Sequence, residues 1–226
     1  MSNYVYNTLT ISNEYRSKIL NSNNEADFNI AVPMPRSFNY TLCSAEEPAV
    51  YAYLSLTNTR DLKDVKNDEL AQKILKNKYL SESAEESVES AYRAYRKIVE
   101  GHPEQNNILY NEGKTLVENF KNYGVMTRYD WAANHWGCRS NADETEISSA
   151  SEENKVKITF CTLNTYPFEW LEALCKAGIP FYLEWIEEQG YHGEVISDGE
   201  EIEENDLDFI EDIDAGLSVE ISDALV

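Results

Sequence analysis

Residues 4–12 read YVYNTLTIS (Tyr4–Ser12), and this stretch decides the fold class. Apolar and polar residues alternate along it, and β-branched and aromatic types are frequent, which is the pattern of a half-buried β-strand. Strand character returns at Thr145–Ser149, Lys155–Thr162, Phe181–Trp185 and, more briefly, Glu194–Ser197. The polar run Ser151-Glu152-Glu153-Asn154 predicts a hairpin between the first two of these four.

Between the first strand and this group the pattern becomes helical. Helices are predicted at 13–21, at 61–78, at 84–99 and from Pro103 to Tyr123, with Gly124 ending the last of them in a left-handed conformation. Phe28, Ile30 and Val32 alternate and predict a second strand, which Pro33-Met34-Pro35 ends. After the hairpin, Thr165 is predicted to cap a helix that Gly178 ends.

This order of elements predicts an α+β fold, a mainly antiparallel sheet with helices packed on one face. We divide the chain into an α+β core at 1–35 and 125–197, a helical insertion at 36–124, and an acidic C-terminal segment at 198–226. With 42% hydrophobic and 12% aromatic residues, the chain has the apolar material for a core.

Net charge is the strongest compositional signal. The chain contains 41 Asp and Glu but only 19 Lys and Arg, so its formal net charge is −22 and its pI is near 4.4. Such a surface repels phosphate backbones and anionic lipid headgroups, so direct binding to nucleic acid or to a membrane is disfavoured. Two interpretations remain: the charge serves solubility, or the carboxylates imitate phosphates and occupy a nucleic-acid-binding protein.

Residues 198–226 contain twelve acids and no base. If this segment is extended, alternate side chains lie about 6.6 Å apart, while DNA carries a phosphate every ~3.4 Å along each strand, so two acidic edges approximate a phosphate array. The alternative is a disordered solubilising tail, although apolar residues such as Phe209, Ile210 and Ile213 need a surface to bury against. The acids predicted to bind the partner are Glu200, Glu201, Glu203, Glu204, Asp206, Asp208, Glu211 and Asp212.

A second candidate site is the corner formed by Asp130, Trp131, His135, Trp136 and Asn141. Aromatic rings beside an asparagine can stack on a ligand and hydrogen-bond it, so the corner supports an alternative function as a small-molecule-binding or enzymatic domain. The structural interpretation is that both tryptophans are core and that the asparagine caps a turn. The sequence contains no nucleophile elbow, HExxH or phosphate-binding loop, so we expect no enzymatic activity.

Cysteine and histidine usage indicates neither disulfides nor a cofactor. Cys43, Cys138, Cys161 and Cys175 are irregularly spaced, and the one tight pair, His135 with Cys138, lacks the second pair that a structural zinc site needs. The start of the chain has neither a basic region nor an apolar run, and no stretch approaches the ~20 apolar residues of a membrane span. We therefore expect a cytoplasmic protein with reduced thiols and no metal.

Several blocks carry a family resemblance. Asn3 to Ile11 (NYVYNTLTI) resembles an "NWCxNxLxIxG" start, and Phe28 to Pro35 resembles an "F…iiPMP" segment. Trp131 with His135 to Ala142 (HWGCRSNA) is similar to a "W…WGTKWNA" block. Phe160 to Pro167 and Glu187 to Gly193 follow in the same order, like "F.TaWspP" and "eegcgfaG". Together they resemble the YubB/Api92-like ferredoxin-like proteins of phages and conjugative plasmids.

The resemblance covers about residues 1–35 and 125–197, and it implies a split βαβ sheet but no assigned activity. Taken with the charge, it leads to the expectation of a mobile-element accessory protein in the bacterial cytoplasm. Such a protein would bind and inhibit a host nucleic-acid-handling defence protein, for example a CRISPR effector or a restriction enzyme. A homodimer through the insertion helices is a further alternative.

Overall fold

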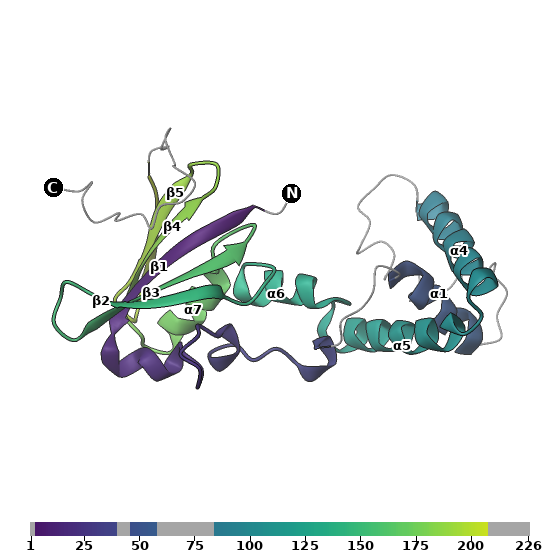
Figure 1. Ribbon diagram of the computed structural model, residues 1–226, viewed down its shortest axis with the longest axis horizontal. Coiled ribbons are helices and arrows are strands. Elements are labelled where there is room, and N and C mark those ends of the chain that lie inside the picture. Colours follow the sequence, from purple (N-terminus) through teal and green to yellow (C-terminus); the bar gives the residue numbers. More distant parts are fainter. Residues whose placement is uncertain (1–2, 40–45, 58–83, 208–226) are drawn as a thin grey trace. The chain divides into compact units, whose positions relative to one another are not determined.

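The chain is divided into two units (Figure 1). Unit 1 comprises residues 1–34 and 132–226, and unit 2 comprises residues 35–131. The computed structural model describes residues 3–39, 46–57 and 84–207; the helix predicted at 61–78 lies outside them. Unit 2 is therefore an insertion into unit 1, whereas the sequence placed the ends of the insertion after residues 35 and 124.

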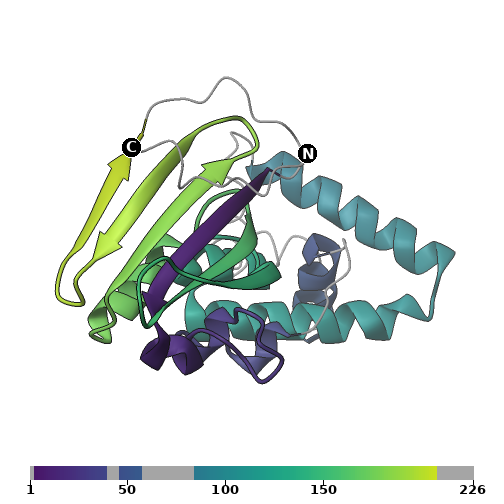
Figure 2. The same cartoon turned by 60° about the vertical axis from the view of Figure 1, so that its left-hand side comes forward.

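A six-stranded sheet forms unit 1, and every neighbouring pair of its strands is antiparallel. Its strand order is β2-β3-β1-β4-β5-β6, which places β1 between β3 and β4 and puts β6, drawn in yellow, at one edge (Figure 2). The strands are β1 (Tyr4–Ser12), β2 (Asp143–Ser149), β3 (Lys155–Leu163), β4 (Phe181–Glu187), β5 (His192–Ser197) and β6 (Ile202–Asp206). The predicted α+β class with an antiparallel sheet is confirmed, and β6 is a strand that the sequence did not predict.

Alternation along β1 builds the buried face of the sheet. Leu9 lies opposite Ile158 of β3 and Leu183 of β4, and all three side chains are fully buried. The same two-residue period carries Val5 and Ile11 into the core while their neighbours point to the other face. The register is thereby determined, because a slip of one residue would expose this whole apolar set.

An aromatic cluster covers that buried face. Helix α7 (Phe168–Lys176) supplies Trp170, which has no exposed surface. The Phe28 ring lies 4.6 Å from the Trp170 ring, 5.6 Å from that of Trp136 and 5.7 Å from that of Phe160. Aromatic rings bury large areas and gain further from edge-to-face contact, so this cluster is the centre of the core of unit 1.

The strand predicted at Phe28–Val32 is wrong, because Phe28–Ile30 form a short 3₁₀ helix. Asp27 caps it by accepting from the backbone N–H of Asn29, and the N–H of Phe28 donates to Asn141 Oδ1 at 2.8 Å. Phe28 is fully buried while Ile30 is 38% exposed. Of the alternating residues only Phe28 is fully buried, and hydrogen bonds to the side chains of Asp27 and Asn141 take the place of a strand ladder.

Two further helix predictions need correction. The first helix is a 3₁₀ helix, Asn13–Lys18, which is shorter than the predicted 13–21. Thr165 does not cap α7, because Pro167 stands at the N-cap position without a side-chain cap and the carbonyl of Thr165 accepts from the Thr162 hydroxyl. The hairpin joining β2 to β3 is confirmed, and so is a left-handed glycine, Gly178, after α7.

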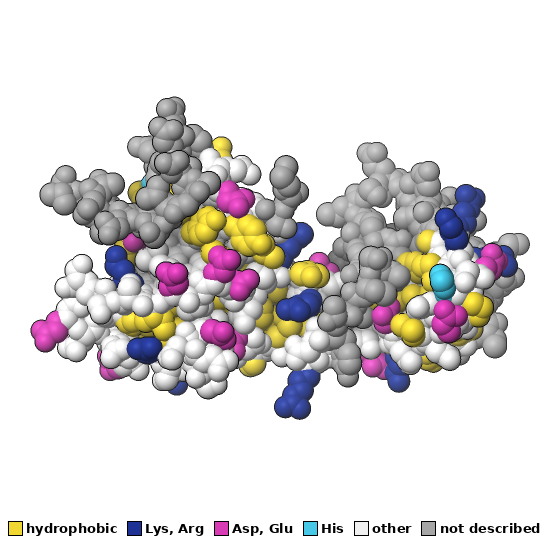
Figure 3. All heavy atoms as spheres, viewed as in Figure 1, with side chains coloured by type: hydrophobic (Ala, Val, Ile, Leu, Met, Phe, Trp, Pro, Cys, Tyr) yellow, Lys and Arg dark blue, Asp and Glu magenta, His cyan; other side chains and the backbone are white. Residues whose placement is uncertain are grey.

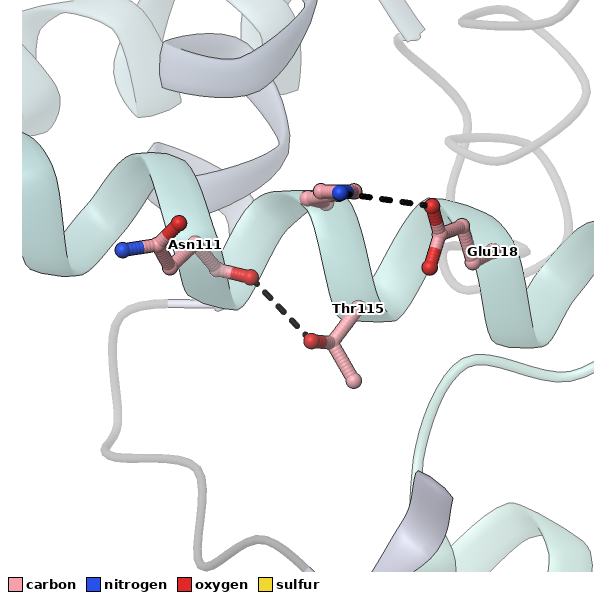
Figure 4. A network of polar contacts seen from close by, with 4 residues as sticks. Asn111, Thr115 and Glu118 are labelled. Carbon is pink, nitrogen blue, oxygen red and sulfur yellow. Dashed lines mark hydrogen bonds and ion pairs between the residues drawn. The ribbon is translucent and has the colours of Figure 1, made fainter.

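Unit 2 is helical. Its described α-helices are α1 (Glu46–Thr57), α4 (Ala84–Gly101), α5 (Gln105–Tyr123) and the start of α6 (Arg128–Trp136), which belongs to unit 1 from Ala132 onward. The predictions for α4 and α5 are confirmed, and Gly124 ends α5 with φ 76°; α1 was not expected. On the surface of α5, Thr115 donates to the carbonyl of Asn111 and Lys114 pairs with Glu118 (Figure 4).

Helices α1 and α5 approach each other closely at a glycine. A Cβ on Gly113 of α5 would overlap the carbonyl oxygen of Ala49 and lie 2.9 Å from Tyr53 Cβ. Ala49 is itself fully buried, so small residues on both helices bring the two backbones together. The core around this crossing consists of Ala49, Val50, Tyr51, Ala52, Leu54, Leu109, Leu116, Val117 and Met126.

Candidate functional site

The two units differ sharply in charge. Unit 1 contains 26 of the 41 acidic residues but only 6 of the 19 basic ones. Unit 2 contains the remaining 15 acids and 13 bases, and is close to neutral. Almost all of the net charge therefore belongs to unit 1, which directs the search for a site to that unit.

The sheet of unit 1 has a second face, opposite the aromatic cluster, which we call the outer face. It is formed by the alternate strand residues Tyr4, Tyr6, Thr8, Thr10, Lys157, Thr159, Tyr182, Glu184, His192, Glu194, Ile196, Glu203 and Asn205. Tyr4 is 42% exposed, Tyr6 49% and Ile196 37%. Exposed tyrosines are enriched at protein-binding surfaces, and the carboxylates around them favour a basic partner.

Two carboxylates lie directly opposite each other on this face. Glu184 of β4 and Glu194 of β5 are cross-strand partners, a position where like charges repel. Glu194 is held by two donors, Tyr182 OH at 2.8 Å and Asn205 Nδ2 at 3.2 Å. Burial raises the pKa of Glu184 and the charge of Glu194 raises it further, while Lys157 and the Tyr182 hydroxyl oppose that change. A cation from a partner would relieve this repulsion.

The predicted acidic segment begins as a turn and continues as the edge strand. Asp198 Oδ1 accepts from the backbone N–H groups of Glu200 at 2.8 Å and Glu201 at 2.9 Å, and these bonds lower the pKa of Asp198. Glu200, Glu201, Glu203, Glu204 and Asp206 are all exposed. The extended conformation is therefore present at 202–206, whereas Asp208, Glu211 and Asp212 lie outside the described residues.

A stacked pair of rings holds β6 at the edge. Tyr166 OH donates to Glu204, and the Tyr166 ring stacks on Trp185 of β4 at 4.8 Å with 12° between the planes. Burial and this hydrogen bond raise the pKa of Tyr166, so its hydroxyl remains a donor. Gly193 of β5 leaves room for the indole, since a Cβ there would lie 2.7 Å from Trp185 Cζ2.

Among the residues that the structure describes, the carboxylates of the outer face and of β6 form no ion pair with Lys or Arg, and the one attraction of this kind is the longer-range influence of Lys157 on Glu184. The ion pairs described in unit 1 join Lys155 to Glu152 and Lys176 to Glu172, outside that set. Figure 3 shows acidic side chains distributed among hydrophobic ones over the visible side of unit 1. Unpaired carboxylates retain their attraction for an incoming basic surface.

Two residues of the predicted ligand corner, Trp136 and Asn141, make structural contacts within unit 1. Trp136 is 1% exposed and its Nε1 donates to the carbonyl of Val32 at 2.9 Å. Asn141 uses both ends of its amide, with Oδ1 accepting from Phe28 N and Nδ2 donating to Asp27 Oδ1 at 2.9 Å. These are the contacts of the structural interpretation, and a ligand role stays a prediction.

The remaining corner residues lie along α6. Thr127 caps the helix by accepting from the backbone N–H of Asp130 at 3.2 Å, and its hydroxyl donates to the Asp130 carboxylate at 2.7 Å. Trp131 is 4% exposed, with its ring 6.1 Å from that of Phe38. His135 is exposed.

Cysteines in the described part of the chain are buried free thiols. Burial raises the pKa of Cys138 and of Cys161 to about 12, so both are protonated near neutral pH and are poor metal ligands and nucleophiles. Cys175 is likewise free and buried, and Cys43 lies outside the described residues. Within residues 3–39, 46–57 and 84–207, no group of three or more His, Cys, Asp or Glu is placed to hold a metal ion.

Sequence reasoning missed the outer face, although the signal was present. Glu184 alternates with Leu183 and Trp185, and Glu194 with Val195, so each predicted strand already assigned an acid to the side away from the core. What the sequence did not contain was the pairing of β4 with β5, which brings these two acids together.

Comparisons with known proteins give one distant similarity. No family model matches the chain, and no curated protein matches it. The crystal structure of protein Api92 from Yersinia pseudotuberculosis, of the family DUF1281, is similar with a TM-score of 0.42 and 9% identity, over 92% of this chain and 99% of that one. No helix among the described residues is long and apolar enough to cross a membrane. At this identity and TM-score the link to Api92 is distant, and the phage or plasmid origin stays a prediction.

Proposed function

We propose that unit 1 is a binding module that occupies the basic, phosphate-gripping surface of a nucleic-acid-handling protein. The observation that carries the proposal is the segregation of charge, with 26 acids against 6 bases in unit 1. The outer face and β6 carry five of these acids on the sheet, Glu184, Glu194, Glu203, Glu204 and Asp206, and alternate residues of a strand lie about 6.6 Å apart. A preorganised acidic surface both accelerates encounter with a basic partner and selects against other partners.

The biological setting of the proposal is that of a mobile element. A protein that competes with nucleic acid for a defence nuclease or CRISPR effector would inhibit it without any catalysis of its own. The topology of the first four strands supports the finer fold assignment that goes with this setting. Their order β2-β3-β1-β4, with helices between β1 and β2 and between β3 and β4, is that of a ferredoxin-like split βαβ sheet.

Affinity capture with matched variants tests the proposal. The bait is the full chain, and captured proteins from a bacterial lysate are challenged with duplex DNA and with salt. One variant reverses three exposed acids of unit 1, Glu200→Lys, Glu203→Lys and Asp206→Lys. The control reverses three exposed acids of unit 2, Glu100→Lys, Glu104→Lys and Glu118→Lys, which gives the same change in net charge.

The expected result is a nucleic-acid-binding protein that DNA displaces from the wild type and from the control but that the unit 1 variant fails to retain. Loss of roughly 1 kcal/mol or more per reversed contact would weaken binding by over a hundredfold. Equal binding by both variants would refute the assignment to unit 1. Capture that DNA does not displace would refute phosphate mimicry.

A further inference from the structure

The two edges of the sheet differ in their capacity to accept another strand. At the β2 edge, the register shifts between Asp143 and Glu146, and Glu144 has φ 51°. Such a bulge twists an edge and interrupts its row of backbone groups. At the β6 edge, five consecutive residues pair with β5 without interruption, from Ile202 opposite Ser197 to Asp206 opposite Gly193.

Backbone groups of β6 alternate between the sheet and the outside. The N–H of Leu207 donates to the carbonyl of His192 on β5 at 3.1 Å. In an antiparallel ladder the direction alternates along the chain, so the N–H and C=O groups of Ile202, Glu204 and Asp206 point away from β5. β6 is the last strand in the sheet order of the described residues, so this outward row lies at the edge (Figure 2).

Side chains of β6 select what can pair there. Glu203 projects to the outer face beside Ile196, while Glu204 and Asp206 project to the opposite face, so acids flank the edge on both sides. Charged side chains protect a sheet edge against indiscriminate pairing, and those of β6 are all acidic. Pairing with β6 of a second copy would bring acids opposite acids, which is repulsive. The complement of this edge is an extended segment with Lys or Arg on both of its faces.

We propose that β6 receives an extended, Lys/Arg-rich segment of the partner protein as a seventh strand. This inference rests on the proposed function and refines it, because it replaces general charge attraction with a defined geometry. The outward backbone groups of β6 supply hydrogen bonds, and the flanking carboxylates supply selectivity for a basic strand. A folded basic surface without a free strand would lack the first of these two contributions.

Two synthetic peptides of equal charge test the inference on the full chain. One repeats Lys-Lys-Val three times, which places Lys on both faces of an extended strand. The other has the same sequence with N-methyl groups on all of its backbone nitrogens, so that neither of its edges can donate hydrogen bonds to β6. Binding is measured by titration calorimetry, and the site is located by amide chemical shifts. On the protein side, Asp206→Pro removes an outward N–H together with one charge, and Asp206→Ala removes the charge alone.

We expect the unmethylated peptide to bind at least about tenfold more tightly than its methylated counterpart, which is the effect of losing two or three hydrogen bonds. The shifts should be confined to the amides of β6 and its neighbours, and Asp206→Pro should weaken binding more than Asp206→Ala. Equal affinity of the two peptides, or binding by neither, overturns strand addition. Capture of a partner that DNA displaces is a separate measurement, so a negative peptide result leaves the proposed function standing. Only a failure of that capture would count against the proposed function.

Discussion

Unit 1 and unit 2 solve the same packing problem with different residues. Unit 1 brings large rings together, with Phe28 within 5.7 Å of three other aromatic rings. Unit 2 uses small residues instead, because Gly113 lets the backbone of α5 approach Ala49 of α1. Unit 1 has 26 acids against 6 bases, whereas unit 2 is nearly balanced and pairs acids with bases along its helices, as Arg96 and Glu100 do. The comparison teaches that charge here belongs to one unit rather than to the whole chain.

Truncation of the aromatic cluster should have the largest effect on stability. It should also show whether the two units unfold independently. Phe28→Ala removes a fully buried ring, and we expect it to lower the free energy of unfolding of unit 1 by about 3–5 kcal/mol. Hydrogen exchange followed by mass spectrometry should show faster exchange in β1, β3 and β4, with peptides of α5 unchanged. Equal acceleration in both units would mean that they unfold as one body. Ile30→Ala, at a 38% exposed position on the same 3₁₀ helix, is the control.

A methyl group at the crossing of α1 and α5 should destabilise unit 2 and leave unit 1 unchanged. Gly113→Ala places a Cβ into the Ala49 carbonyl, so the helices must separate, and we expect unit 2 to lose about 2–3 kcal/mol. Exchange should accelerate in α1 and α5 and remain slow in the sheet. Gly101→Ala is the matched control, since nothing lies within 4 Å of its Cβ. A similar loss in the two variants would contradict close packing at Gly113.

Removal of the Asn141 amide should have an intermediate effect within unit 1. Asn141→Ala leaves the N–H of Phe28 and the carboxylate of Asp27 without this partner, and we expect a loss of about 1–3 kcal/mol. Chemical denaturation monitored by tryptophan fluorescence measures it. A variant as stable as the wild type would instead favour a ligand role for this residue. Asn205→Ala, whose exposed amide bonds to Glu194, is the surface control.

Neutralising Glu184 on the outer face should have the smallest effect on stability, and this effect should be stabilising. The pKa of Glu184 is raised in the folded state, so its contribution is favourable below the unfolded pKa and is lost as the pH rises through the folded value. Glu184→Gln removes the like-charge pair with Glu194 and should therefore stabilise the protein at pH 7 by roughly 0.2–1 kcal/mol. Thermal melts at pH 4 and pH 7 should show the gain at the higher pH alone; destabilisation at pH 7 would contradict the proposed repulsion.

Strand alternation was sufficient to predict five of the strands and their buried faces, because a two-residue period is local information. Phe28 was misassigned because its N–H is bonded to Asn141, more than a hundred residues away, a contact that no local pattern contains. β6 was missed for a related reason: its sequence, IEEND, has one apolar residue, and it is a strand because β5 and Tyr166 hold it.

The candidate site was partly predictable. The exposed acids Glu200 to Asp206 follow from composition and from the lack of bases after residue 197. The opposed pair Glu184 and Glu194 depends on sheet register, which a single sequence does not specify. The tryptophans of the predicted corner drew attention for their chemistry, yet Trp136 is 1% exposed and its indole N–H bonds to the backbone of Val32.

The insertion of unit 2 also sets an order of events during synthesis. β1 leaves the ribosome before its two partner strands, which begin only at Lys155 and Phe181, so all of unit 2 is made in between. At about 5–20 residues per second, β1 waits roughly 10–30 s with an apolar edge unpaired. During that interval the apolar residues of β1 lack the partner strands that bury them, so the exposure of aggregation-prone surface is greatest before the sheet closes.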